Sequence, residues 1–286
     1  MHKIIFLIHC EDRKGLLATI SQYFYSRGYN ILHCQQHSDV RSNRYYMRIE
    51  LDLADLKTTR KELQNEFNTF AQTLNLTWQC HFTDYRNRVA LMVSKTSHCL
   101  FDLLSRQHEG DLKCDFPLII SNHITCEPIA EQFRVPYYYL PITKGNKAEQ
   151  ETQVHELLKT HDIDVIVLAR YMQVLSEEFT STWWGKVINI HHAFLPAFQG
   201  ANPYLRAYER GVKMIGATAH YASEDLDQGP IIEQDVVRVN HELSPEGLRK
   251  VGKDVERQVL FRAVQAHLEH RIIMYNNRTV VFNAEY

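Results

Sequence analysis

The order of apolar segments between residues 89 and 192 most strongly restricts the fold of this chain. Short apolar runs at 89–94 ("VALMVS") and 164–169 ("DVIVLA") alternate with segments at 97–107 and 147–158 that have the pattern of helices. Parallel strands joined by helical crossovers are the simplest architecture for such an order. The pattern therefore predicts an open, mostly parallel α/β sheet.

The same pattern continues into the rest of the second half of the chain. Ser244 and Pro245 are typical of an N-cap and a first helical turn, so they predict that a long helix begins there. Ligands of open α/β sheets bind beyond the carboxyl ends of the strands, so we expect the site to follow the strand at 186–192. The other expected elements are strands at 116–121 and 137–141, a helix at 126–133, two strands around a turn within 213–239, and the long helix at 244–270.

Residues 1–83 contain a different order of elements. Residues 3–9 ("KIIFLIH") are typical of a buried strand, and the apolar positions that follow are spaced as in a helix. Residues 45–53 alternate between apolar and polar side chains, as in a sheet with one solvated face. A second helical stripe and the strand-like "LTWQCHF" complete the order βαββαβ, which is the ferredoxin-like arrangement. We therefore expect a domain at 1–83, a linker at 84–88 and a second domain at 89–286.

The composition of the 286 residues excludes several classes of protein. A net charge of −2 lacks the basic excess of a dedicated nucleic-acid or membrane-surface binder, so we expect neither partner. The six cysteines form no CxxC pair and the 16 histidines show no HExxH spacing, so we expect no metal site and no disulfide framework. The start of the chain lacks the pattern of a secretory signal and no segment has transmembrane length, which favours a cytoplasmic protein.

The stretch "INIHHAF" at 188–194 places polar side chains at the end of the last expected parallel strand. Successive side chains of a strand point to opposite faces, so Asn189 and His191 share one face and His192 lies on the other. An amide and an imidazole can both donate to developing negative charge, which predicts an oxyanion-stabilising or acid/base pair. The alternative is a hydrogen-bonded pair that only caps the strand. For His192 we expect a structural role.

A loop at 222–229 ("ASEDLDQG") carries a carboxylate that could complete this site. Asp and Gly are common in turns that have no chemical role, so the loop by itself indicates little. Beside His191, however, a carboxylate of this loop, Asp225 or Asp227, would complete a set of base, proton shuttle and oxyanion donor. Thr218 and His220 share a face of the preceding strand, and we expect His220 to support the catalytic groups. A hydrogen-bonded core histidine is the alternative for His220.

Two long segments resemble the folate-dependent formyltransferase fold. They are "INIHHAFLPAFQGANPY" at 188–204 and "TAHYASEDLDQGPIIEQ" at 218–234, which contain the Asn-x-His and later Asp-x-Gly pattern of that fold. The start of the chain, where "EDRKG" leads into "LLATISQYFYSRGYNI", resembles an ACT domain, a module that senses small molecules. An ACT-like unit followed by a formyltransferase-like unit resembles the formyltetrahydrofolate deformylase family, and this resemblance covers essentially all 286 residues.

The resemblance implies a reaction and roles for three residues. 10-Formyltetrahydrofolate would be hydrolysed to tetrahydrofolate and formate, which supplies formate for purine synthesis and balances the one-carbon folate pool. The folate is the substrate, so no resident cofactor is implied. By the same resemblance, Asn189 and His191 stabilise the oxyanion, while Asp227 activates the attacking water and relays its proton.

The resemblance also implies where folate and effectors bind. The backbone around Arg170, Tyr171 and Met172 would border the pterin, and Gly229 would belong to the folate site. ACT domains associate with one another and bind amino acids at the interface, which implies a homo-oligomer, either a dimer or a tetramer. Glycine and methionine are the effectors that we expect, and a dimerisation module without a ligand is the alternative. The effector site would be formed by Asp12, Arg13, Lys14 and Gly15.

Three other activities are compatible with parts of this sequence. Glycinamide ribonucleotide formyltransferase passes the same formyl group to an amine, but it binds phosphate through a glycine-rich segment after its first strand. Here that loop, Ser94 to His98, has no glycine, which favours water as the acceptor. A methionyl-tRNA formyltransferase would need a basic nucleic-acid-binding extension, which we do not expect here. A folate-binding sensor without activity is disfavoured by the intact Asn-x-His and Asp-x-Gly residues.

Overall fold

The structure is a computed structural model in which residues 2–197 and 202–284 are described. Residues 198–201, part of the formyltransferase-like segment, lie outside the described residues. The chain divides into two compact units. The first consists of Met1–Arg86, Glu269–Tyr275 and Thr279–Tyr286, and the second consists of Asn87–Leu268 and Asn276–Arg278.

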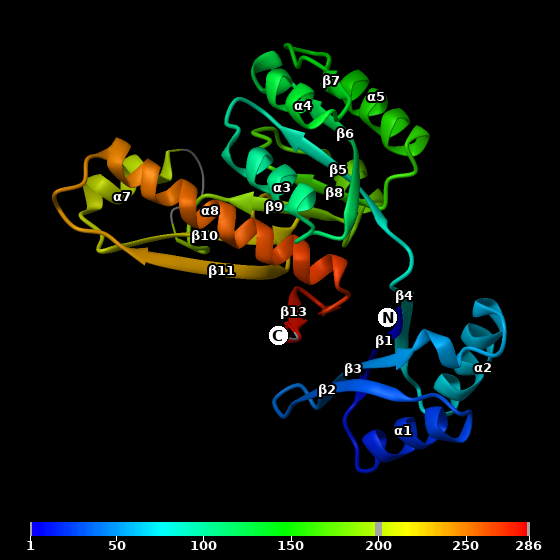
Figure 1. Cartoon of the computed structure of the whole chain (residues 1–286). Helices are drawn as coiled ribbons and strands as arrows, with labels where there is room; N and C mark the ends of the chain where they lie inside the picture. Colours follow the sequence, from blue (N-terminus) through cyan, green and yellow to red (C-terminus); the bar gives the residue numbers. More distant parts are fainter. Residues whose placement is uncertain (1, 198–201, 285–286) are drawn as a thin grey trace. The chain divides into compact units, whose positions relative to one another are not determined.

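The first unit has the predicted βαββαβ order (Figure 1). Its elements are β1 (Lys3–Glu11), α1 (Leu16–Ser26), β2 (Ile31–Asp39), β3 (Arg44–Asp52), the short 3-10 helix Leu53–Asp55, α2 (Arg60–Thr73) and β4 (Thr77–Phe82). The four strands form one antiparallel sheet in the order β2-β3-β1-β4. Helices α1 and α2 cover one face, where Phe24 and Phe67 pack on Phe6 of β1. The ferredoxin-like prediction is therefore confirmed.

The second face of this sheet is not solvated, contrary to the prediction from the alternation in β3. Arg48 and Glu50 lie in β3 with side chains that are only 4% and 3% exposed, and their charged groups are 2.6 Å apart. The Arg48 guanidinium also donates hydrogen bonds to the carbonyl oxygens of Glu269 and His270. Charged residues in a strand do not by themselves indicate a solvated face, because an ion pair and backbone carbonyls can satisfy them.

The C-terminal segment packs within the first unit and helps to cover that face. The strands β12 (Ile272–Tyr275) and β13 (Arg278–Val281) form a hairpin, and Ile273 and Phe282 pack against apolar residues of β1. The predicted second domain at 89–286 therefore extends too far toward the C-terminus. The physical reason is that β1 is apolar on both faces, so both of them need a cover.

The second unit has the predicted open α/β sheet. In the described part of the chain, seven strands lie in the order β11-β10-β9-β8-β5-β6-β7. The five strands from β5 to β9 pair in parallel, whereas β10 is antiparallel to both β9 and β11. The bounds are β5 (Asn87–Val93), β6 (Cys114–Ser121), β7 (Tyr137–Tyr139), β8 (Val165–Leu168), β9 (Val187–His191), β10 (Met214–Tyr221) and β11 (Ile231–Arg238).

Helices cover both faces of this sheet. The helices are α3 (His98–Glu109), α4 (Glu127–Phe133), α5 (Lys147–Thr160), α6 (Glu177–Thr182), α7 (Pro203–Arg210) and α8 (Pro245–Leu268), with the short 3-10 helix Ile124–Cys126 before α4. One core cluster includes Val154 and Leu158 of α5 and Phe179 of α6. On the other face α3 packs against α8, and α8 crosses β9, β10 and β11. The short helices α6 and α7 were not predicted, because one or two turns carry too little periodicity.

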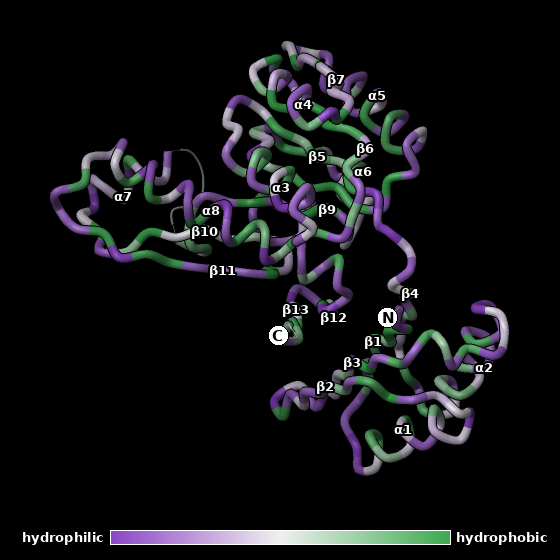
Figure 2. Tube along the Cα trace, viewed as in Figure 1, coloured by the Kyte–Doolittle hydropathy of each residue, from purple (hydrophilic) through white to green (hydrophobic). Residues whose placement is uncertain are grey.

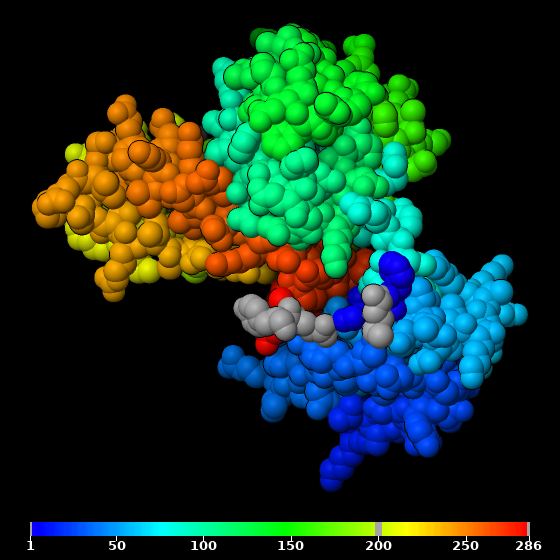
Figure 3. All heavy atoms as spheres, viewed as in Figure 1, coloured from blue at the N-terminus to red at the C-terminus, as the bar shows by residue number. Residues whose placement is uncertain are grey.

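Helix α8 has the mixed character of a helix with one buried face. Its trace in Figure 2 alternates between hydrophobic and hydrophilic residues. In the space-filling view of Figure 3, the atoms of α3 and α4 (green) and of α8 (orange) form part of the surface of this unit. Among the helices of the described residues, none combines the length and the hydropathy needed to cross a membrane.

The strand order brings polar side chains together at one edge of the sheet. Strands β8 and β9 are parallel, so their carboxyl ends lie at the same edge. Strand β10 is antiparallel to β9, with Thr218 opposite His191 and His220 opposite Asn189. The two predicted supporting residues therefore lie directly beside the two predicted oxyanion donors.

Candidate active site

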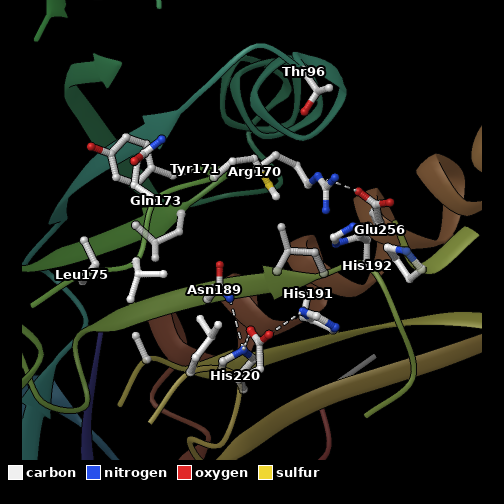
Figure 4. Close-up of a pocket in the computed structure, with 18 of the residues that line it drawn as sticks. Thr96, Arg170, Tyr171, Gln173, Leu175, Asn189, His191, His192, His220 and Glu256 are labelled. Atoms are coloured by element: carbon white, nitrogen blue, oxygen red, sulfur yellow. Dashed lines mark hydrogen bonds and ion pairs between the residues drawn. The ribbon is translucent and has the colours of Figure 1, made fainter. Parts of the chain in front are cut away.

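A cavity of about 550 Å³ lies beyond the carboxyl ends of β8 and β9, where ligands of open α/β sheets bind. Its lining includes Asn189 and His191 of β9 and His220 of β10 (Figure 4). Asp227, from the loop between β10 and β11, also lines it. The structure therefore brings the three predicted catalytic residues together around one cavity.

Asp227 contacts both histidines of this group. Its Oδ2 lies 3.1 Å from His191 Nδ1, and its Oδ1 lies 3.7 Å from His220 Nε2. The three side chains are nearly buried, with exposed fractions of 9% for Asp227, 6% for His191 and 2% for His220. In such a setting the carboxylate stabilises positive charge on the rings, and the rings stabilise its negative charge.

The environment keeps Asp227 ionised. Burial opposes its charge, but hydrogen bonds from His191 and His220 and the positive charge of these rings outweigh burial, so the pKa of Asp227 is held well below its usual range. The backbone φ of Asp227 is 59°, a left-handed conformation that costs a residue with a side chain about 1 kcal/mol. The neighbouring Asp225 is exposed, so Asp227 is the carboxylate of this loop that lies beside His191.

His220 links Asp227 to Asn189. Its Nδ1 lies 2.9 Å from the carbonyl oxygen of Tyr221, so Nδ1 carries a proton and donates it to that carbonyl. Its Nε2 lies 3.2 Å from Asn189 Nδ2 and 3.7 Å from Asp227 Oδ1, so the ring contacts both side chains. The Asn189 amide keeps a second N–H for a ligand in the cavity. This position fits the supporting role predicted for His220.

Thr218 holds the segment that follows His191. Its hydroxyl donates to the carbonyl oxygen of Ala193 at 2.9 Å and accepts from the amide of Leu195 at 3.0 Å. The Gln234 side chain also donates to this hydroxyl, at 2.9 Å. Thr218 therefore acts on His191 through the backbone that leaves β9.

The second ring nitrogen of His191 is available to a ligand. Nδ1 is turned to Asp227, and the buried Nε2 has no hydrogen-bond partner among the described residues. A buried polar atom without a partner is costly unless a ligand satisfies it. A protonated ring can donate from Nε2 to the oxygen of a bound carbonyl group.

Comparisons with known proteins agree with the architecture of both units. The formyl transferase family model matches residues 87–264, and the ACT domain family model matches residues 4–68. A formyltetrahydrofolate deformylase of Synechocystis is 52% identical over 96% of this chain and 97% of its own length. The chain belongs to the formyltetrahydrofolate deformylase family.

Solved structures relate this deformylase chain to amine formyltransferases. The crystal structure of a formyltetrahydrofolate deformylase from Pseudomonas syringae pv. tomato has a TM-score of 0.96 and 42% identity, over 99% of this chain and 95% of that chain. A phosphoribosylglycinamide formyltransferase from Anaplasma phagocytophilum has a TM-score of 0.64 and 27% identity, over 71% of this chain and 97% of that chain. Because this fold is shared with a formyltransferase, the fold alone does not decide the acceptor.

The segment predicted to border the pterin lies in the cavity wall of the deformylase. Arg170, Tyr171 and Met172 all line the cavity. The Ser94 hydroxyl accepts from the Met172 amide at 3.0 Å, and the Ser94 amide donates to the Arg170 carbonyl at 3.2 Å. The Tyr171 hydroxyl is buried and accepts a hydrogen bond from Gln150 at 3.1 Å. A pterin contact with this segment stays a prediction.

Gly229 has a structural role in the loop that carries Asp227, and the folate contact predicted for it stays a prediction. It is buried and is not among the residues that line the cavity. A Cβ atom at this position would lie 1.8 Å from the carbonyl oxygen of Tyr221, so only glycine allows the loop to return this closely to β10. Gly229 therefore shapes the loop that carries Asp227.

A second polar cluster in the same cavity was not predicted. Glu256 of α8 is 1% exposed; it accepts hydrogen bonds from His98 Nε2 at 2.8 Å and from the Tyr204 hydroxyl, and it lies 3.3 Å from Arg170 Nε. Burial opposes its charge, but His98 and Arg170 hold the pKa of Glu256 below its usual range. A carboxylate four residues after Gly252 on the buried stripe of α8 is the sequence signal that could have indicated it.

One group of side chains could hold a metal ion, although the sequence predicts no metal site. Among the described residues, ligand atoms of His98, Cys99 and Glu256 lie within 4.8 Å of one another. Burial raises the pKa of Cys99 well above its usual value, which favours the thiol over the thiolate that metals bind. The hydrogen bonds to Glu256 explain this group without a metal.

His192 is held as a neutral ring. Burial and the charge of Arg170 lower the pKa of His192 to about 3. Its ring centroid lies 5.9 Å from that of Tyr204. A neutral, packed imidazole fits the structural role predicted for His192.

The predicted effector residues lie in the turn between β1 and α1. Gly15 has φ 90° and directly precedes the first residue of α1. The Arg13 guanidinium donates to the carbonyl oxygen of Leu74. Asp12 is half-buried, whereas Arg13, Lys14 and Gly15 are exposed. The turn is accessible to a small molecule.

Proposed function

We propose that this chain hydrolyses 10-formyltetrahydrofolate to tetrahydrofolate and formate, with water as the formyl acceptor. The observation that carries the proposal is the buried His191 ring, which contacts the Asp227 carboxylate through Nδ1 and leaves Nε2 without a partner. One cavity of about 550 Å³ therefore offers a donor for the formyl oxygen and a carboxylate for the attacking water.

The residues divide the chemistry of the reaction between them. The water oxygen bonds to the formyl carbon, the formyl oxygen becomes negative, and the folate nitrogen takes a proton as its bond to carbon breaks. His191 Nε2–H and the Asn189 amide donate to the developing oxyanion, and one preorganised donor of this kind contributes about 3 kcal/mol. Asp227 takes one proton of the water and passes it to the folate nitrogen as that nitrogen leaves.

The low pKa of Asp227 determines when that proton moves. A carboxylate that is strongly ionised is available throughout the neutral range, but it is a weak base toward free water. The water becomes acidic as its oxygen bonds to the formyl carbon, so proton transfer becomes favourable late in the attack. Before that step, the charge of Asp227 orients the water and stabilises a protonated His191.

We expect formate to appear at the same rate with and without glycinamide ribonucleotide, and no formylated nucleotide to accumulate. The loop from Ser94 to His98 carries a side chain at every position, so it cannot bring its amides to a phosphate as a glycine-rich loop does. Mass spectrometry of one time course quantifies both products. Stoichiometric formyl transfer to the nucleotide would identify an amine formyltransferase and would leave the roles of His191 and Asp227 unchanged.

The first unit supports a proposal for regulation. The ACT domain family model matches it, and the exposed first turn of α1 offers backbone amides to a carboxylate, while Asp12 offers a partner to an ammonium group. We infer that glycine or methionine binds there and that the chain forms a dimer or a tetramer. We place the protein in the cytoplasm, where its six free cysteines stay reduced.

Titration calorimetry of the full chain with glycine and with methionine tests this regulation. We expect one of the two to bind, and we expect Asp12→Asn to weaken its binding because the ammonium group loses its charged partner. Glu66→Gln, at an exposed position of α2 in the same unit, is the matched control and should bind as the wild type does. Binding of neither amino acid, together with a monomer in light scattering, would contradict both parts of the proposal.

A further inference from the structure

The active-site cavity has a second polar wall, which the hydrolysis described above does not use. Arg170 at the end of β8 and Glu256 of α8 form its centre (Figure 4), and His98 of α3 and Tyr204 of α7 hold Glu256 from the other sides. Arg170 is 12% exposed, yet its Nε and Nη1 atoms have no hydrogen-bond partner among the described residues. The 3.3 Å ion pair with Glu256 thus leaves guanidinium donors unsatisfied.

Three features of this wall lower the stability of the folded protein or restrict its sequence. Arg170 has φ 67°, a left-handed conformation that is strained for a residue with a side chain. Burial of an ion pair also removes both charges from water, which opposes folding. A Cβ atom at Gly252 would lie 2.1 Å from the Tyr204 hydroxyl oxygen, so a glycine inside α8 is needed for Tyr204 to reach Glu256. Strain and buried charge at the wall of an active site indicate a function.

We propose that the Arg170 side chain, held by Glu256, selects water as the formyl acceptor and excludes amines. This inference rests on the proposed hydrolysis and names the groups that set its specificity. Arg170 lines the same cavity as Asn189, His191 and Asp227. Its Nη1, which has no hydrogen-bond partner among the described residues, donates to the group that occupies the acceptor position.

The selection follows from the lone pairs of the two acceptors. A neutral amine has one lone pair on nitrogen, and a hydrogen bond from the guanidinium occupies it, so the amine cannot attack. Water has two lone pairs: one accepts from Arg170 while the other attacks the formyl carbon. A protonated amine is repelled by the positive guanidinium and has no lone pair at all.

Glu256 acts as a positioning residue. Its contact with Nε fixes the guanidinium in one orientation, and His98 and Tyr204 fix Glu256 in turn. The wall does not take part in bond breaking. In hydrolysis and in transfer alike, the acceptor bonds to the formyl carbon and gives a proton to Asp227, while the folate nitrogen leaves with a proton. Substitution of Arg170 or Glu256 can therefore change the acceptor while the bond-making and bond-breaking steps stay the same.

The test is the ratio of two products in Arg170→Gly, because glycine accepts φ 67° and removes the guanidinium. The full chain is incubated with 10-formyltetrahydrofolate and glycinamide at mildly alkaline pH, and N-formylglycinamide and formate are quantified by mass spectrometry. The wild type should form formate without transfer above the uncatalysed rate. Arg170→Gly should raise the ratio of transfer to hydrolysis by about tenfold or more. Glu256→Gln should raise the ratio less, because the guanidinium is retained but less firmly held.

A matched control separates this role from a general disturbance of the cavity. Arg249→Ala removes another guanidinium that lines the same cavity and should leave the product ratio at the wild-type value. An unchanged ratio in folded Arg170→Gly would overturn the inference, even where the rate of formate release falls. If Arg170→Gly does not fold, an unchanged ratio in Glu256→Gln would overturn it. Absence of formate release by the wild type would instead contradict the proposed hydrolysis.

Discussion

We expect Asp227→Asn to lower kcat for formate release by about three orders of magnitude, while the variant still folds and binds folate. Asparagine keeps the shape of the side chain, but an amide can neither take the proton of the attacking water nor stabilise a protonated His191. The 3.1 Å contact with His191 and the 3.7 Å contact with His220 both lose their negative charge. Formate release under saturating substrate and calorimetric titration with tetrahydrofolate measure turnover and binding separately.

Asp225→Asn is the control for that experiment. Asp225 lies in the same loop and is exposed, so its substitution changes the net charge equally without touching the histidines. It should retain nearly all of the wild-type turnover. Near-normal turnover in Asp227→Asn would contradict the assignment of Asp227 as the base, and an equal loss in both variants would indicate a general effect of loop charge.

His191→Asn should lower kcat by about two to three orders of magnitude with little change in KM. Its Nε2 is a buried atom without a hydrogen-bond partner in the described residues, and we expect it to donate to an oxygen that becomes negative only in the transition state. Steady-state kinetics of formate release separates the two parameters. A large rise in KM with unchanged kcat would indicate that His191 binds the ground state, which contradicts an oxyanion role.

His220→Asn is the comparison for His191. His220 lies farther from Asp227 than His191 does, and its ring forms hydrogen bonds with the Asn189 side chain and the Tyr221 carbonyl oxygen. We expect its loss to lower kcat by about tenfold, through the placement of Asp227 and Asn189. The double variant Asp227→Asn/His191→Asn should lose little more than Asp227→Asn alone, because residues that act as a unit are not additive.

Local patterns were sufficient for most elements of the fold and for the pairing of Asn189 with His191 on one face of a strand. The alternation of strands and helices indicated a parallel sheet, and a strand period of two residues placed Asn189 and His191 on one face. The choice between Asp225 and Asp227 needed the structure, because both residues suit a turn. Backbone conformation decides between them: Asp227 takes φ 59° and lies beside His191, while Asp225 is exposed.

The order of elements and the common face of Asn189 and His191 follow from local patterns, because periodicity records which side of each element is buried. Asp227 followed from the family resemblance. Contacts distant in the chain pack the C-terminal hairpin with the first unit and bury Arg48 and Glu50 of β3. The tertiary structure alone brought Glu256 to Arg170. These contacts join residues far apart in the chain, and their energy comes from mutual burial and charge pairing, which no local pattern contains.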